Sequence, residues 1–163
     1  MHKQIRFFVM DVDGTLTDGK IYMGSSGEVM KVFNIKDGYG IHDKLLPNNV
    51  IPVIITGRQS AIVENRCHEL GISEVHQGVS DKLKKLQEIV YRYDRTLQDV
   101  AYIGDDMNDL TCMKAIKAAQ GLTGCPADAD KELIQFCDFV STKNGGEGAV
   151  REFIDYILGL STD

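Results

Sequence analysis

An acidic motif, Asp11-Val12-Asp13-Gly14, follows an apolar run that begins at Phe7 and is typical of a buried strand. Side chains at positions i and i+2 of an extended strand point the same way, so the carboxylates of Asp11 and Asp13 can converge just beyond the strand end. Buried carboxylates cost free energy unless they are paired or bound to metal. Such a pair suits phosphate chemistry, in which one carboxylate attacks, the other carries protons and a hard divalent cation holds both to the phosphate.

The tetrapeptide alone has two other interpretations, a plain turn and part of a calcium-binding loop. The calcium loop requires glycine at its sixth position, where this chain has Leu16. The plain turn stays open for the tetrapeptide, but it does not explain the other charged residues described below.

Two further positions suit a bound phosphate. Thr56 ends the apolar run 50–55, and its hydroxyl, together with the N–H groups that open the helix behind it, suits a phosphate oxygen. Thr56 alone is an equally good helix N-cap. Lys82 stands in the first turn of a predicted helix, where a cation opposes the helix dipole, so a bound anion explains it better than a surface position does.

Three carboxylates, those of Asp105, Asp106 and Asp109, crowd one strand-to-helix junction. They repel one another unless a cation or lysine is near, and a helix N-terminus accounts for only one or two of them. The glycines of segment 144–152 permit close approach to a ligand, and Arg151 could clamp a carboxylate or phosphate. A flexible loop before a capped helix explains that segment equally well.

The chain has 163 residues, of which 43% are hydrophobic and 26% charged, which is typical of one globular domain with a sizeable core. Its net charge of −6 argues against nucleic acid or an anionic membrane as partner. There is no apolar run of membrane-spanning length and no signal-peptide pattern, so we expect a cytoplasmic protein. The scattered cysteines are expected to be reduced, and the histidines lack metal-ligand spacing.

Strand-like and helix-like segments alternate along the chain, which predicts an α/β fold over the single domain 1–163. The fold expected is a Rossmann-like, mostly parallel sheet with helices on both faces and no cap domain. Predicted strands cover 7–10, 50–55, 73–76 and 100–103. One predicted helix carries an apolar face from Ile62 to Leu70 and ends at Gly71. Asp81 can cap the next one, whose buried face includes Tyr93. A third carries Leu110 and Met113 inward, and a last one carries an apolar stripe from Val150 to Leu158.

A β-hairpin flap is predicted at about 20–33, directly after the first strand. Its apolar content is high for a flap exposed on both faces, so we expect it to pack on another subunit. Folding back onto its own domain is the alternative.

Taken in order, Asp-x-Asp-Gly-Thr, Thr-Gly-Arg, Lys and Gly-Asp-Asp-x-x-Asp resemble the motifs of the haloacid dehalogenase superfamily of phosphohydrolases over nearly the whole chain. This resemblance implies that Asp11 is the nucleophile that forms an aspartyl-phosphate. Asp13 is then the general acid for the leaving alcohol and afterwards the base for water. Thr56 and Lys82 bind the phosphoryl group.

The same resemblance implies a Mg²⁺ site. Its ligands are Asp11, the backbone carbonyl of Asp13, and Asp105. Asp106 and Asp109 are expected to contact these ligand residues without binding the metal themselves. Alternatively, Asp109 binds Lys82.

A finer similarity links the chain to the capless family of 3-deoxy-D-manno-octulosonate 8-phosphate phosphatases. It rests on Asp-Val-Asp-Gly-Thr-Leu-Thr-Asp-Gly, the hairpin, Ile-Thr-Gly-Arg-Gln-Ser and Gly-Gly-x-Gly-Ala-Val-Arg-Glu. This similarity implies a homotetramer in which hairpins meet neighbouring subunits. We expect Arg58 or Arg66, together with the 145–148 loop that contains Gly145, Gly146 and Glu147, to bind the carboxylate end of the substrate. Gly57 is expected to bind the substrate as well.

The expected activity is Mg²⁺-dependent hydrolysis of 3-deoxy-D-manno-octulosonate 8-phosphate in lipopolysaccharide precursor synthesis. One alternative is a phosphatase of a nine-carbon sialic-type sugar acid 9-phosphate. Another is a non-catalytic regulatory or assembly module on the same scaffold. A signalling receiver also has an acidic Mg²⁺ pocket, but its paired acids belong after the first strand, whereas the Asp105-Asp106 pair follows a late one.

Overall fold

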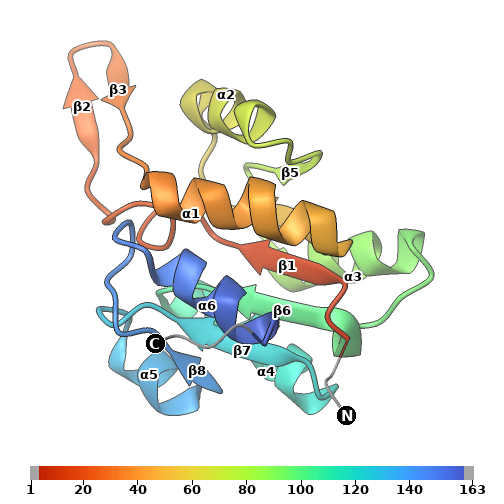
Figure 1. Cartoon of the computed structure of the whole chain (residues 1–163). Helices are drawn as coiled ribbons and strands as arrows, with labels where there is room; N and C mark the ends of the chain where they lie inside the picture. The colour runs from red at the N-terminus through yellow and green to blue at the C-terminus, as the bar shows by residue number, and fades with distance from the viewer. Residues whose placement is uncertain (1–3, 160–163) are drawn as a thin grey trace.

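A parallel sheet of six strands forms the centre of the computed structural model, which describes residues 4–159 (Figure 1). The strand order is β5-β4-β1-β6-β7-β8, and every neighbouring pair is parallel. The strands are β1 (Phe7–Met10), β4 (Ile51–Ile55), β5 (Glu74–His76), β6 (Val100–Ile103), β7 (Leu122–Cys125) and β8 (Phe139–Val140). The predicted fold class is confirmed, and β1 lies between β4 and β6.

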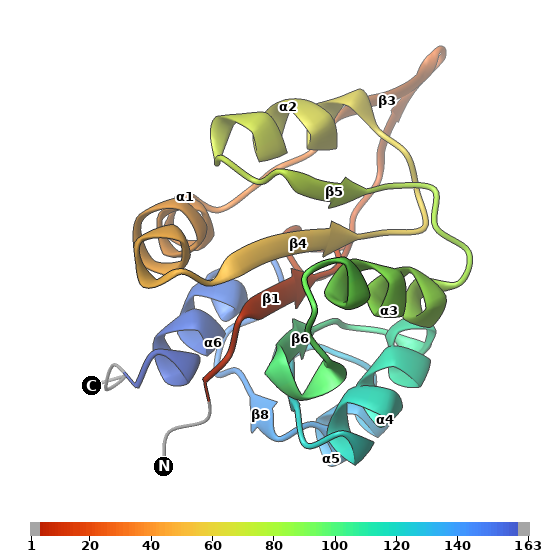
Figure 2. The ribbon, with the colours of Figure 1, turned by 90° about the vertical axis from the view of Figure 1, so that its right-hand side faces the viewer.

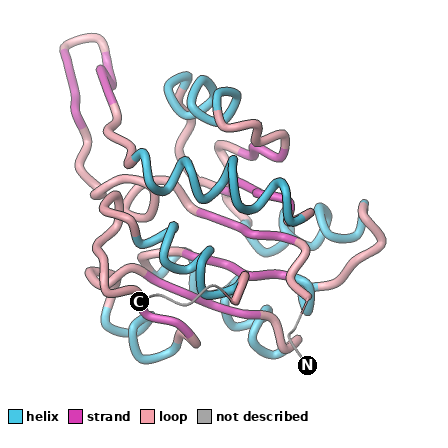
Figure 3. Tube along the Cα trace, in the orientation of Figure 1, coloured by secondary structure: helices cyan, strands magenta, loops and turns pink. Residues whose placement is uncertain are grey.

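Helices cover both faces of this sheet (Figure 2). One face carries α1 (Ile35–Tyr39), α2 (Ala61–Glu69) and α6 (Ala149–Ile157). The other face carries α3 (Lys82–Arg92), α4 (Leu110–Ala118) and α5 (Lys131–Phe136). After Tyr39, α1 continues through a π-helical stretch, η1 (Gly40–Leu45), and a 3₁₀ turn, η2 (Leu46–Asn48), so that Figure 3 shows one long helix.

The strands are apolar because both of their faces are buried. In β1, Phe8 and Met10 pack in the core under α2 and α6, whereas Phe7 and Val9 pack in the core under α3 and α4. This alternation follows from the period of two along a strand. β1 ends at Met10, so Asp11 follows directly at the carboxyl end of this central strand.

Side-chain caps start the helices that lie next to the site. Ser60 caps α2 by accepting a hydrogen bond from the backbone N–H of Ile62. Asp81 caps α3 by accepting from the N–H of Lys84, as predicted. Because Ser60 caps α2, Thr56 is not the N-cap.

The hairpin is present and projects from the body of the molecule (Figure 1). It consists of β2 (Tyr22–Gly24) and β3 (Gly27–Met30), which pair antiparallel. Its apolar side chains are not folded onto the domain, because Met23 and Val29 are each 62% exposed. Ile21, Met30 and Val32 are exposed as well.

Several elements were not predicted from the sequence. These are the long helix of 35–48 and the stretch containing β7, α5 and β8. In β7 the glycine at position 124 is required, because a Cβ there would lie 2.9 Å from the ring of Phe153. The expected burial of Tyr93 on the helix capped by Asp81 is wrong, because Tyr93 lies just past the end of α3 and is 39% exposed.

Within residues 4–159, no helix combines the length and the apolar character needed to cross a lipid bilayer.

Replacing Phe153 by alanine should lower the free energy of unfolding by about 3–5 kcal/mol, because the ring is fully buried and its loss leaves a cavity. Phe153 packs against Phe8 and Phe139, with ring centroids 5.5 and 5.1 Å away. Tyr91→Ala is the matched control, because Tyr91 is 83% exposed. It should cost about 0.5 kcal/mol or less. Urea denaturation measures both, and equal losses would contradict this account of the core.

Candidate active site

A cleft opens at the carboxyl ends of β1, β4 and β6, where open α/β sheets bind their ligands. Each strand contributes the residue that follows it: Asp11, Thr56 and, after one further residue, Asp105. The cleft has a volume of about 210 Å³. Its lining residues are Asp11, Asp13, Thr56, Gly57, Arg58, Asp105, Asp106 and Asn108.

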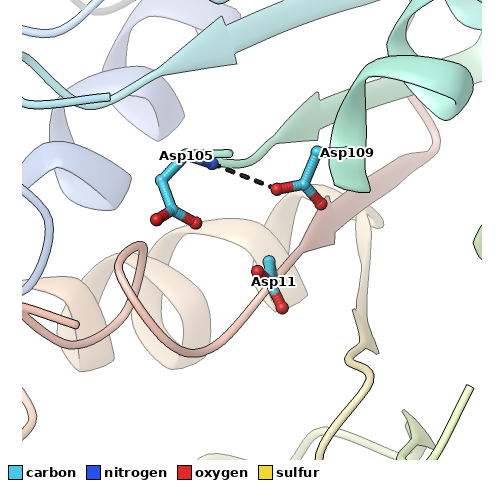
Figure 4. Close-up of side chains that lie close together, drawn as sticks. All are labelled: Asp11, Asp105 and Asp109. Carbon is cyan, nitrogen blue, oxygen red and sulfur yellow. Dashed lines mark hydrogen bonds between the residues drawn. The ribbon is translucent and has the colours of Figure 1, made fainter. Parts of the chain in front are cut away.

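Three carboxylates converge at the floor of the cleft (Figure 4). Asp11, Asp105 and Asp109 each offer an oxygen, and these oxygens lie within 4.8 Å of one another. Asp109 is fully buried and accepts from Lys82 Nζ at 3.0 Å and from the hydroxyl of Tyr102 at 2.6 Å. Its other oxygen accepts from the backbone N–H of Asp105 at 3.1 Å. Asp109 therefore holds Lys82 and the loop after β6 in place.

Lys82 is the cation that faces this cluster. Its Nζ lies 3.3 Å from Asp11 Oδ1, and its side chain is 5% exposed. Burial lowers the pKa of Lys82, but Asp109 and Asp11 outweigh that effect and raise it overall. The lysine therefore stays charged beside Asp11, where it can also meet a phosphate oxygen.

The acidic cluster holds more negative charge than one lysine offsets. Burial and then the charge of Asp109 raise the pKa of Asp11 from 3.8 to about 6, although Lys82 opposes them. Burial and then Asp11 raise the pKa of Asp105 from 3.8 to about 7. Carboxylate oxygens are the ligands that Mg²⁺ prefers, so this donor set fits a divalent cation that would favour the ionised forms.

Asp13 lines the same cleft but turns its carboxylate to other partners. Oδ1 lies 2.6 Å from Lys31 Nζ, and Oδ2 lies 3.9 Å from Nη1 of Arg58. Its side chain is not one of the three that converge on the cleft floor. This placement is compatible with the predicted backbone-carbonyl ligand, which leaves the side chain available for proton transfer.

Asp106 is exposed and caps the 3₁₀ turn η4 (Met107–Asp109), where its side chain accepts from the N–H of Met107. Together with Asp109 it forms a capping box. The helix-terminus interpretation therefore explains Asp106, whereas Asp105 and Asp109 belong to the carboxylate cluster.

The glycine-rich loop lies against the loop that follows Asp11. The N–H of Gly146 donates to the carbonyl of Thr15 at 3.1 Å, and a Cβ on Gly145 would lie 1.9 Å from the carbonyl oxygen of Gly14. These glycines are thus required by packing inside one chain. Glu147 is exposed. Contact of this loop with a substrate stays a prediction.

Two arginines lie away from the cleft. Arg66 pairs with Glu69 at 3.0 Å, and Arg151 pairs with Asp155 at 3.2 Å. The suggestion that Arg151 clamps a ligand is wrong for this cleft, because its guanidinium lies over the ring of Tyr39. Arg66 does not line the cleft of its own chain either, so its contact with a ligand stays a prediction. Arg58 is the arginine that lines the cleft.

Four residues contact the predicted site residues but were not themselves predicted. Thr15 donates to Asp105 at 3.3 Å, and Tyr102 donates to Asp109. Lys31, which follows β3, forms an ion pair with Glu28 of that strand. A signal was available for Tyr102, which is the one polar-tipped residue in the apolar strand β6. Lys31 gave no signal, because charged residues are ordinary in exposed hairpins.

In the metal-free protein, the free energy of unfolding should fall as pH rises from about 4 to about 7. The reason is that Asp11 and Asp105, with pKa values of about 6 and 7 instead of 3.8, bind more protons in the folded state over that interval. Mg²⁺ should therefore raise Tm more at pH 8 than at pH 5. Asp105→Asn should raise the metal-free Tm at pH 8 by a few degrees and abolish the response to Mg²⁺.

Thermal melting with EDTA or Mg²⁺ at the two pH values tests this. Asp43→Asn is the control, because Asp43 is half exposed and pairs with His42 outside the cleft. An unchanged Mg²⁺ response in Asp105→Asn would contradict the site.

Known proteins resemble this chain in sequence. A family model described as haloacid dehalogenase-like hydrolase matches residues 68–154. The 3-deoxy-D-manno-octulosonate 8-phosphate phosphatase of Salmonella typhi is 44% identical over 156 residues, which cover 96% of this chain and 80% of that protein.

Solved structures agree with the sequence comparison. The crystal structure of the 3-deoxy-D-manno-octulosonate 8-phosphate phosphatase from Yersinia pestis superposes with a TM-score of 0.91 at 42% identity, covering 98% of this chain and 83% of that one. The enzyme from Moraxella catarrhalis, in complex with a magnesium ion, a phosphate ion and a KDO molecule, gives 0.89 at 39% identity, with 98% and 89% covered. The chain therefore belongs to the family of haloacid dehalogenase-like hydrolases.

Proposed function

We propose that this chain is a Mg²⁺-dependent phosphatase that hydrolyses 3-deoxy-D-manno-octulosonate 8-phosphate to the free sugar acid and phosphate. The observation that carries the proposal is the acidic cleft lined by Asp11 and Asp105, together with Lys82, whose Nζ lies 3.3 Å from Asp11 Oδ1. It occurs in a chain 39% identical to the Moraxella catarrhalis enzyme that holds magnesium, phosphate and KDO. In this proposal residues 1–163 form one phosphatase domain with a hairpin flap and no cap.

The residues of the cleft divide the chemistry between them. A carboxylate oxygen of Asp11 bonds to phosphorus while the bond from phosphorus to the sugar oxygen breaks, and Asp13 gives that oxygen its proton. Water then attacks the aspartyl-phosphate, Asp13 takes up a proton, and phosphate leaves. Lys82 and Thr56 hold the phosphoryl oxygens through both steps. Asp11, the backbone carbonyl of Asp13 and Asp105 would hold Mg²⁺. When bound, the ion supplies positive charge that offsets the negative charge of the phosphate and of Asp11.

The sugar acid end of the substrate needs recognition from outside the phosphate site. Arg58 lines the cleft with its side chain 44% exposed, so its guanidinium is available to a carboxylate. The cleft volume of about 210 Å³ is below the roughly 300–1,000 Å³ of sites that enclose small ligands. A neighbouring subunit, which brings its own Arg66 or its 145–147 loop, would complete the enclosure.

Assembly is therefore part of the proposal, and we expect a homotetramer built through the hairpins. Full burial of an apolar side chain such as Met23 or Val29 stabilises by about 1.5–3 kcal/mol, and both are exposed in the single chain. A cytoplasmic location and a role in lipopolysaccharide precursor synthesis complete the proposal.

The alternatives are not favoured. The nine-carbon sugar acid phosphatase has no counterpart among the relatives described above. A non-catalytic module would not need Asp11 and Asp105 in one cleft with Lys82 paired to Asp11.

Wild-type protein should hydrolyse 3-deoxy-D-manno-octulosonate 8-phosphate with the highest kcat/KM in a panel of sugar acid phosphates, as measured by phosphate release. Asp11→Asn should lower turnover by several orders of magnitude and leave the fold intact, because the amide is nearly isosteric but a poor nucleophile. Asp43→Asn should match the wild type. Preference for a nine-carbon substrate would overturn the substrate assignment, and normal turnover by Asp11→Asn would overturn the mechanism.

Replacing Met23 and Val29 together by aspartate should yield species smaller than the wild type in light scattering, because charge on the exposed hairpin face opposes subunit contact. Turnover of the sugar acid phosphate should fall. Hydrolysis of p-nitrophenyl phosphate should persist to a greater extent, since Asp11 and Asp13 belong to one chain. Tyr91→Asp, on the exposed side of α3, should change neither size nor activity. A fully active wild-type monomer would contradict the assembly proposal.

A further inference from the structure

A buried lysine ties the base of the hairpin to the cleft. Lys31 directly follows β3, and the flanking residues Met30 and Val32 are 46% and 54% exposed. The side chain of Lys31, by contrast, is only 2% exposed, and its Nζ lies 2.6 Å from Asp13 Oδ1. Removing an ammonium group from water costs free energy unless it is paired. This lysine is thus turned inward toward Asp13.

The second partner of Lys31 extends the contact to the loop after β4. Glu28 Oε2 lies 3.0 Å from Lys31 Nζ and 3.4 Å from Nη2 of Arg58. Its Oε1 accepts from the hydroxyl of Ser60 at 2.7 Å. Because Ser60 also caps α2, Glu28, which pairs with Met23 near the turn of the hairpin, fastens β3 to a fixed helix end.

The network leaves both oxygens of Asp13 with a cationic neighbour. Oδ1 faces Lys31, and Oδ2 faces Arg58 at 3.9 Å. An aspartate side chain alone has several staggered rotamers, whereas proton transfer requires the carboxylate within hydrogen-bond reach of the leaving oxygen. The closest of these contacts, that with Lys31, therefore has the largest influence on which rotamer Asp13 adopts.

We infer that Lys31 and Glu28 are positioning residues that hold the carboxylate of Asp13 where it serves the leaving oxygen of the substrate. The inference rests on the proposed phosphatase function, in which Asp13 transfers that proton. In this role the hairpin contributes to catalysis, because its displacement would move Lys31 away from Asp13.

A comparison of two substrates with different leaving groups distinguishes this positioning role from a merely structural one. The sugar alcohol departs as a poor leaving group that needs a proton, whereas p-nitrophenolate departs without one. Lys31→Met keeps the side-chain length and removes the charge. It should lower kcat on 3-deoxy-D-manno-octulosonate 8-phosphate by about tenfold or more, and kcat on p-nitrophenyl phosphate by less than about threefold, because general acid catalysis contributes about 10²–10⁴-fold. KM should change little for either ester.

Two further variants complete the test. Lys31→Arg should restore most of the lost kcat, because it returns a cation to Asp13. Lys20→Met is the matched control on the same flap, since Lys20 is 75% exposed and its ion pair is with Asp18, so both esters should react as with wild type. Light scattering and thermal melting confirm that each variant is assembled and folded. Should Lys31→Met fail to fold, Glu28→Gln serves as the test. Its kcat on the sugar acid phosphate should fall selectively in the same way, but by a smaller factor.

Equal losses on both esters in a folded, assembled Lys31→Met would overturn the positioning role and leave the proposed function standing. Behaviour identical to Lys20→Met would do the same. A wild-type protein that hydrolyses neither ester would overturn the proposed function and this inference together.

Discussion

The crowding of buried negative charge at one edge of the sheet is the constraint on which the rest of the structure depends. Asp11, Asp105 and Asp109 bring oxygens within 4.8 Å of one another, and two unit charges at that distance repel by about 3–4 kcal/mol at an effective dielectric constant of 20. Lys82 compensates one charge and leaves two. A divalent cation has the charge to match them, and a phosphate can then approach a floor that would otherwise repel it.

The hairpin side of the cleft shows the opposite electrostatics. Asp13 and Glu28 carry two negative charges, and Lys31 and Arg58 carry two positive ones, all within one set of ion pairs. That side is neutral without any ion. One side of the cleft, at Asp11, thus has an excess of negative charge that a cation can offset. The other side, at Asp13, has equal numbers of negative and positive side chains. The two aspartates are only two residues apart in the sequence.

The parts of the site that depend on local sequence were predictable. Strand ends place Asp11, Thr56 and Asp105 at one edge because parallel strands share a direction, and the cap at Asp81 puts Lys82 at the start of α3. The residues that were missed depend on contacts between distant segments. Nothing in the apolar alternation of the hairpin shows that Lys31 turns inward. Likewise, β8 has two residues, too few for a periodic pattern.

The contact between the glycine loop and the loop after Asp11 has a consequence for how the protein forms. Asp11 is made early in synthesis, but the backbone that supports the loop after it, at Gly145 and Gly146, is made late. A ribosome-bound chain therefore carries Asp11 through most of elongation without that support. Closing so long a loop is slow and entropically costly. The loop after Asp11 therefore acquires this support only once segment 144–148 has been made.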